Sequence, residues 1–226
     1  MAGRRKKLHP TSAGRRPSLF ELTAGVLCLD FVNTLDNRPS GEPLELLARY
    51  GDLVRFAEDT GILTPAQADR WLARSEADPE EAQRVLRTAV ELREAMFAVF
   101  SAVIAKRSVP ASALALLNGY IQRAAQHLSL TPADGGFAWR YDSCGDSPGG
   151  FETMLWPIVR SAAELLASDQ LQFVRACASK TCEWLFLDES KNHRRRWCDM
   201  TKCGNRAKVR RFYKRGLSRK KKTDQE

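Results

Sequence analysis

The sequence has no long apolar run, and it lacks the features of an exported chain. No stretch is apolar over the roughly 20 residues that a membrane-spanning helix needs. The basic N-terminus is followed by Glu21 and Asp30, which interrupt the clean apolar segment expected of a signal peptide. Leu27 stands before Cys28, where a lipidated cysteine would follow a small residue. We therefore expect a cytoplasmic protein with no membrane partner, in which structural disulfides are disfavoured.

Residues typical of catalysis are also scarce. The chain has 3 histidines, and His127 is the only one in the central part of the sequence. It has no paired-carboxylate motif and no glycine-rich phosphate loop, so we predict that it is not an enzyme. Asp30, Asn33 and Thr34 interrupt an apolar segment, which leaves two alternatives. Either they line a pocket for a small-molecule effector, or they cap helices and satisfy buried backbone groups.

Acidic residues are missing from the first 18 residues and sparse after residue 170. Residues 1–18 carry 6 basic and no acidic residues, and residues 171–226 carry 17 basic and 6 acidic residues. The segment between them carries 13 basic and 21 acidic residues, a net charge of −8 in a chain of net charge +9. An acidic body with basic ends is typical of a protein with a separate polyanion-binding element. A solubilising role suits residues 1–18 and 218–226, which we expect to be disordered tails.

Hydrophobic periodicity predicts a mainly α protein with a small β element. The longest expected helix begins at Asp78 as N-cap, with Pro79 at its first position and an apolar stripe from Val85 to Val103. Thr64 and Pro65 mark the start of another helix. Phe137 to Tyr141 alternate as a hairpin strand does. The expected helices cover residues 44–60, 64–74, 78–107, 111–128 and 152–167, after a first core segment at 19–35.

Four of the 6 cysteines form two pairs with matching spacing. The pairs are Cys177 with Cys182 and Cys198 with Cys203, each separated by four residues. Two short loops that each present two thiolates suit the tetrahedral geometry of zinc, and the alternative is four unconnected thiols. Short apolar strands flank the first pair and a helix follows the second, as in a treble-clef or zinc-ribbon-like finger. Zinc would stabilise a segment too small to build its own core. Cys28 and Cys144 fall outside the pattern, and His193 is an alternative ligand.

The helix expected after Cys203 has two unlike faces. Val209, Phe212, Tyr213 and Gly216 share one arc, which we expect to dock on the finger. The opposite arc is cationic, and an arginine-rich loop before Cys198 adds to it. The resulting basic surface comprises Arg194, Arg195, Arg196, Arg206, Lys208, Arg210, Arg211, Lys214 and Arg215. We expect it to bind double-stranded DNA, with RNA or the ribosome as the alternative.

Asn205 and Arg206 open this helix and allow two interpretations each. Asn205 suits adenine and Arg206 suits guanine, through bidentate hydrogen bonds to base edges. Alternatively, Asn205 is the N-cap of the helix and Arg206 forms a salt bridge or clamps a phosphate.

Two resemblances follow from these motifs. The segment "CASKTCEWLFLDESKNHRRRWCDMTKCGNRAKVRRFYKR" resembles the CGNR zinc finger, and "LCLDFVNTLDNR" with the helical segment after it resembles the ABATE domain of stress-induced transcription regulators. The resemblance implies a bacterial, zinc-dependent, DNA-binding transcription regulator with the four paired cysteines as ligands. We therefore expect an ABATE-like domain at 19–168, which senses an effector or forms a homodimer, and a finger at 171–217. The change in charge near 168–172 predicts two separate folding units.

Overall fold

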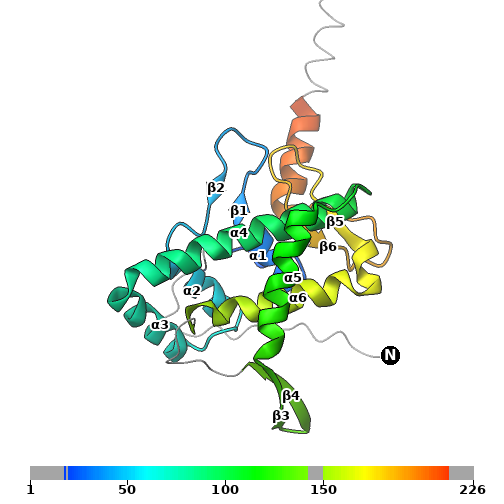
Figure 1. The fold of residues 1–226 in the computed structure, drawn as a ribbon. Coiled ribbons are helices and arrows are strands. Elements are labelled where there is room, and N and C mark those ends of the chain that lie inside the picture. Colours follow the sequence, from blue (N-terminus) through cyan, green and yellow to red (C-terminus); the bar gives the residue numbers. More distant parts are fainter. Residues whose placement is uncertain (1–17, 19, 142–149, 214–226) are drawn as a thin grey trace, which may run out of the picture.

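Helices form most of this chain in a computed structural model (Figure 1). The structure describes residues 18, 20–141 and 150–213. The tail expected at 218–226 and residues 1–17 of the tail expected at 1–18 lie outside the described residues, as do Cys144, Lys214, Arg215 and Gly216. In the described part of the chain, no helix is both long and apolar enough to cross a membrane.

The elements alternate helices with three short antiparallel hairpins. The helices are α1 (Leu27–Val32), α2 (Tyr50–Asp59), α3 (Pro65–Ala77), α4 (Pro79–Ile104), α5 (Ala111–Gln126) and α6 (Trp156–Leu166). The hairpins pair β1 (Leu35–Asp36) with β2 (Leu44–Glu45), β3 (Leu128–Ala133) with β4 (Gly136–Tyr141), and β5 (Val174–Ala176) with β6 (Leu185–Leu187). Short helical turns are η1 (Gly150–Leu155), η2 (Asp169–Phe173) and η3 (Met200–Gly204), and residues 205–213 continue η3 as an α-helix.

The capped helix starts are confirmed. The side chain of Asp78 accepts a hydrogen bond from the backbone N–H of Glu81, and Pro79 opens α4. Thr64 and Gln67 form a reciprocal capping box at the start of α3. The stripe of α4 is buried from Val85 to Val99, and this helix packs against α1, α2, α3 and α5. Helix α4 is therefore the central support of the body (Figure 1).

Two helix boundaries differ from the prediction. The helix expected over 44–60 begins only at Tyr50, because Leu44 and Glu45 pair with β1. The Glu45 carboxylate accepts two hydrogen bonds from the buried guanidinium of Arg93, at 2.6 and 2.7 Å, which holds this segment on α4. The helix expected over 152–167 begins with the 3-10 turn η1, and α6 follows with Pro157 in its first turn.

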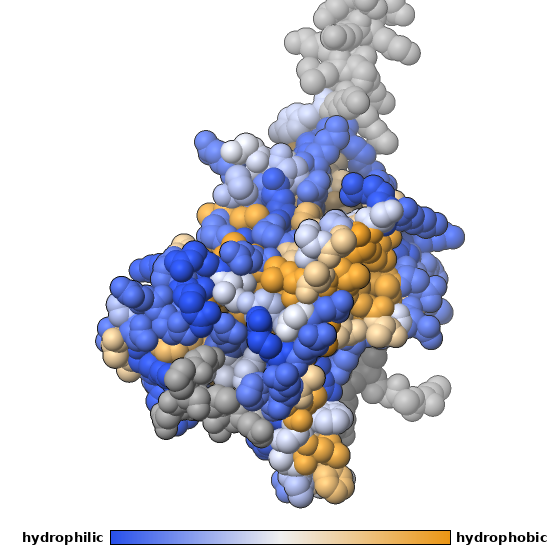
Figure 2. All heavy atoms as spheres, in the orientation of Figure 1, coloured by the Kyte–Doolittle hydropathy of each residue, from blue (hydrophilic) through white to orange (hydrophobic). Residues whose placement is uncertain are grey.

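The β3–β4 hairpin adds little to the core. Figure 2 shows apolar side chains gathered over α5 and at the tip of this hairpin. Leu130 and Phe137 are 53% and 71% exposed, so the alternation that predicts the strand does not bury one of its faces.

The finger and the helical body share one hydrophobic core. Leu185 and Phe186 of β6 belong to the same buried cluster as Phe31 of α1 and Met96 of α4. The backbone N–H of Leu187 donates to the Ala24 carbonyl at 2.8 Å. Despite the change in charge near 168–172, this packing favours cooperative unfolding over two independent units.

Candidate metal centre and nucleic-acid interface

The four paired cysteines converge on one point. Their Sγ atoms all lie within 4.8 Å of one another, and all four residues are buried. Cys198 Sγ lies 3.6 Å from Cys182 Sγ and 3.7 Å from Cys203 Sγ. Zn–S bonds of about 2.3 Å at tetrahedral angles would separate the sulfurs by about 3.8 Å. The cluster thus has the donors, the spacing and the burial of a four-thiolate metal site.

Two loops present these thiols. In the first, the β5–β6 hairpin is extended by a hydrogen bond from the Cys177 N–H to the Trp184 carbonyl, 2.8 Å long. In the second, Asp199 caps η3 by accepting hydrogen bonds from the N–H groups of Thr201 and Lys202. Gly204 packs closely on Met200, because a Cβ at Gly204 would lie 2.5 Å from Met200 Sδ and would require that side chain to move.

The thiols influence one another's protonation. Hydrogen bonds from the thiols of Cys182 and Cys198 lower the pKa of Cys177. The same hydrogen bonds, together with burial, raise the pKa of Cys182 and Cys198. Without a metal, the cluster therefore retains protons, and a divalent cation would displace them by binding the thiolates.

Arg206 supports the cluster from outside. Its Nη2 donates to Cys203 Sγ at 3.2 Å. Partial burial lowers the pKa of Arg206, but the charge and hydrogen bond of Cys203 offset this and leave it raised. His193 is not brought to the cluster: its Nδ1 lies 2.7 Å from the Asp188 carbonyl, and its ring stacks on Phe173 at 3.9 Å. Among the residues that the structure describes, four sulfurs and no imidazole lie at the candidate metal site.

The Arg195 side chain forms its contacts within the protein. Its guanidinium donates to the carbonyls of Trp197, Cys198 and Thr23, and lies 4.4 Å from the centroid of the Phe186 ring. The backbone N–H of Arg195 also donates to the buried carboxylate of Asp188 at 2.8 Å. These contacts join the arginine-rich loop to the metal loop and to the body.

Besides Arg206, which is exposed and contacts Cys203, five of the cations expected to contact nucleic acid are exposed within the described residues. They are Arg194, Arg196, Lys208, Arg210 and Arg211. Lys202, which was not among the expected contacts, is instead paired with Glu21 of the body. Together the five form a basic surface beside the thiol cluster. Two of them lie on the loop before Cys198 and three on the helix after Cys203.

The expected docking of the helix's apolar arc on the finger is wrong. Val209, Phe212 and Tyr213 are 53%, 75% and 65% exposed. Figure 1 shows residues 205–213, coloured orange-red, projecting away from the body, and the exposure of these three side chains shows that the described part of the finger does not bury the arc. The N-cap of this helical segment is Asp199, while the Asn205 side chain donates to the Thr201 carbonyl at 2.8 Å.

Asp30, Asn33 and Thr34 form hydrogen bonds with backbone groups, which is the second of the two roles considered for them. Asn33 forms two hydrogen bonds with Leu185 of β6. Its Nδ2 donates to the Leu185 carbonyl at 2.8 Å, and its Oδ1 accepts from the Leu185 backbone N–H at 2.9 Å. Asp30 accepts from the Ala24 N–H, and Thr34 donates to the Phe31 carbonyl. All three therefore satisfy backbone groups, and none of them lines the large cavity described next.

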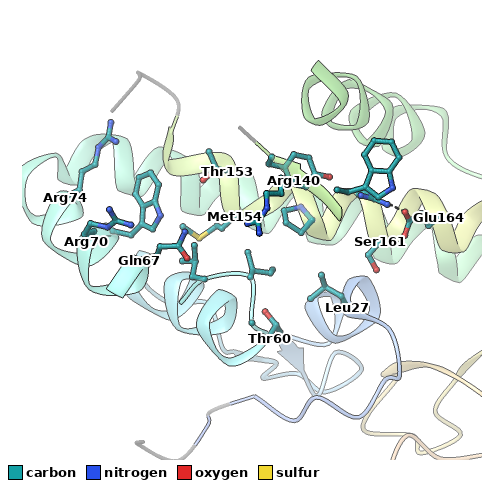
Figure 3. A pocket seen from close by; sticks show the side chains of 18 residues that line it. Leu27, Thr60, Gln67, Arg70, Arg74, Arg140, Thr153, Met154, Ser161 and Glu164 are labelled. Atoms are coloured by element: carbon teal, nitrogen blue, oxygen red, sulfur yellow. Dashed lines mark hydrogen bonds and ion pairs between the residues drawn. The ribbon is translucent and has the colours of Figure 1, made fainter. Parts of the chain in front are cut away.

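That cavity, of about 1040 Å³, lies between α3, β4 and α6 (Figure 3). Four arginines line it: Arg70, Arg74, Arg140 and Arg160. Sequence reasoning missed this site, because its residues come from segments up to 137 positions apart, from Leu27 to Glu164. The spacing of Arg70 and Arg74, four apart around Trp71, was the one local signal for it.

Comparison with known families matches both parts of the chain. A family model described as "Putative stress-induced transcription regulator", the ABATE domain, matches residues 25–169. A second model, the CGNR zinc finger, matches residues 174–216. Neither is an enzyme family. A search of curated proteins finds no match.

Proposed function

We propose that this chain, which belongs to the ABATE family and carries a CGNR zinc finger, is a zinc-dependent, DNA-binding transcriptional regulator. The observation that carries the proposal is the buried four-thiol cluster with five exposed cations on the loop and helix beside it. The helical body would bind a small-molecule effector.

Zinc is the metal that this donor set favours. Cys177, Cys182, Cys198 and Cys203 would hold it, and bound zinc would supply structural cross-linking of the two loops. Four thiolates fill the tetrahedral shell and leave no open position for a substrate. This supports a structural role for the metal and a function in binding.

The exposed cations would act on the phosphate backbone. Lys208, Arg210 and Arg211 lie on one helix whose start is held by the Asp199 cap, so they would meet neighbouring phosphates together and release counterions. Base readout by Asn205 and Arg206 stays a prediction. The contact of Arg206 with Cys203 uses one of its five N–H donors and would hold its guanidinium in a fixed place.

The salt dependence of binding tests this function. If about five cations meet phosphates, the logarithm of the association constant for duplex DNA should fall with that of salt at a slope of about −4 to −5. Arg210→Ala should weaken binding to every duplex similarly and flatten the slope by about one unit. Arg107→Ala is the matched control, because Arg107 is an exposed cation in the turn after α4. A slope near zero, or equal losses in both variants, would contradict the proposed interface.

RNA is the alternative partner, because a basic finger can also bind structured RNA. Competition between duplex DNA and a structured RNA at equal salt separates the two. Preferential displacement by RNA would replace DNA in the proposal. A homodimer formed through the body stays a prediction, which sedimentation of the full chain tests.

A further inference from the structure

We propose that the arginine-lined cavity of the body binds an organic anion with an aromatic or flat apolar part. This inference rests on the effector-binding role proposed for the body, and it names the site and the ligand class. The cavity, of about 1040 Å³, is large enough for a small organic molecule rather than for one inorganic ion.

The charge of the cavity points to an anion. Its lining carries four arginines and one acidic residue, Glu164. Glu164 accepts a hydrogen bond from Arg160 at 2.6 Å, so it offsets the charge of one arginine, and no other acidic residue lines the cavity within the described residues. This concentration lies within a segment, 19–170, whose net charge is −8. The positive lining is therefore a local feature of the site and not of the surrounding body.

Two of the arginines have no carboxylate partner. Within the described residues, neither Arg70 nor Arg140 forms an ion pair. Arg70 also shares a helix face with Arg74, and like charges four residues apart destabilise a helix. Figure 3 shows Arg70 and Arg74 on one side of the cavity and Arg140 toward its middle. An anionic oxygen group between these side chains would relieve their repulsion and accept charge-assisted hydrogen bonds.

The remaining lining suits a flat apolar group. Trp71, Trp139 and Tyr141 supply aromatic faces, and Leu27 and Met154 supply aliphatic contacts. Trp139 is 55% exposed, which leaves much of its indole open to contact. An aromatic acid or an aromatic phosphate ester combines the two requirements. A simple ion would use only the arginines.

Calorimetric titration of the metal-loaded full chain tests the site with three related probes. These are 1-naphthyl phosphate, 1-naphthoate and the neutral 1-naphthylmethanol. We expect at least one anion to bind more tightly than the neutral compound, and the better anion identifies the preferred headgroup. Arg70→Gln combined with Arg140→Gln should weaken that anion at least about tenfold, because two charge-assisted contacts are lost.

The control is the double variant Lys106→Gln, Arg107→Gln. It loses two positive charges, as the double variant of the cavity does. Lys106 and Arg107 are exposed and do not line the cavity. This control should leave anion affinity within about twofold, since long-range charge effects are screened by salt. Arg70→Lys with Arg140→Lys retains the charge and should recover part of the affinity, which separates ligand contact from a folding defect.

The proposal is overturned if neither anion binds at millimolar concentration, if the neutral compound binds equally well, or if both double variants lose affinity equally. Duplex-DNA binding by the Arg70→Gln, Arg140→Gln variant is measured in parallel. It should be unchanged, so failure of the cavity proposal would leave the DNA-binding proposal standing.

Discussion

Removing the side-chain amide of Asn33 should weaken the attachment of the finger to the body. Asn33 is 4% exposed and pairs with both the N–H and the carbonyl of Leu185. Asn33→Ala would leave one backbone donor and one acceptor unpaired in the core. Each such group costs about 1–3 kcal/mol, which gives a total of about 2–6 kcal/mol. Water entering the vacated space would offset part of this, so we expect about 2–4 kcal/mol.

Urea unfolding of the zinc-saturated chain, followed by circular dichroism, measures this loss. Asn118→Ala is the matched control, because Asn118 is exposed on α5 and its replacement should change stability by at most about 0.5 kcal/mol. The rate of zinc transfer to a chelator gives a second readout and should rise in Asn33→Ala alone. A loss below about 1 kcal/mol with an unchanged transfer rate would refute the reasoning that Asn33 joins the two parts.

Three further predictions concern the metal and a buried carboxyl group. Cys203→Ser should lose the metal on elemental analysis while Cys144→Ser retains it; full retention in Cys203→Ser would show that the site is assigned wrongly. Chelation of the native chain should lower the unfolding midpoint of the body as well as that of the finger, because they share a core; an unchanged body transition would restore two independent units. Burial raises the pKa of Asp30 to about 6, although hydrogen bonds from Ala24 and Thr23 partly lower it. The folded protein therefore binds a proton that the unfolded chain has lost between about pH 4 and 6, so this group's contribution to stability falls as pH rises through that window. Asp30→Asn should remove that fall, and its stability relative to the native chain should rise by up to about 3 kcal/mol from pH 4 to 7; a pH-independent difference would contradict the shift.

Local signals account for the parts of the fold that the sequence predicts correctly. The capped start of α4 is set by residues close to Asp78 in the sequence. The pairing of the cysteines is likewise visible from their spacing within a short segment. The errors arise where distant segments decide the outcome. Glu45 leaves the expected helix because Arg93, 48 positions away, binds its carboxylate. The apolar arc of the last helix is visible from periodicity, but periodicity cannot show whether any surface covers it.

The cavity illustrates the same limit more strongly. Arg70 and Arg140 come to line one cavity only when α3 and β4 are brought together in the folded chain. Asn33 could be seen as a polar residue in an apolar segment, whereas its partner Leu185 lies 152 positions away. Tertiary packing, rather than local preference, assigns these residues their roles.

The projection of residues 205–213 has a consequence for how this helix forms. Nine residues are fewer than the 12–15 that an isolated helix needs for marginal stability in water, and its exposed apolar arc contributes no burial. Its first turn therefore has to be nucleated from outside, by the Asp199 cap and by Cys203 once the proposed metal is bound. Amide hydrogen exchange should consequently be slowest near Arg206 and accelerate toward Tyr213, and chelation should erase this gradient. The metal would then act as a helix nucleus. Metal occupancy would decide whether Lys208, Arg210 and Arg211 are held on one helix.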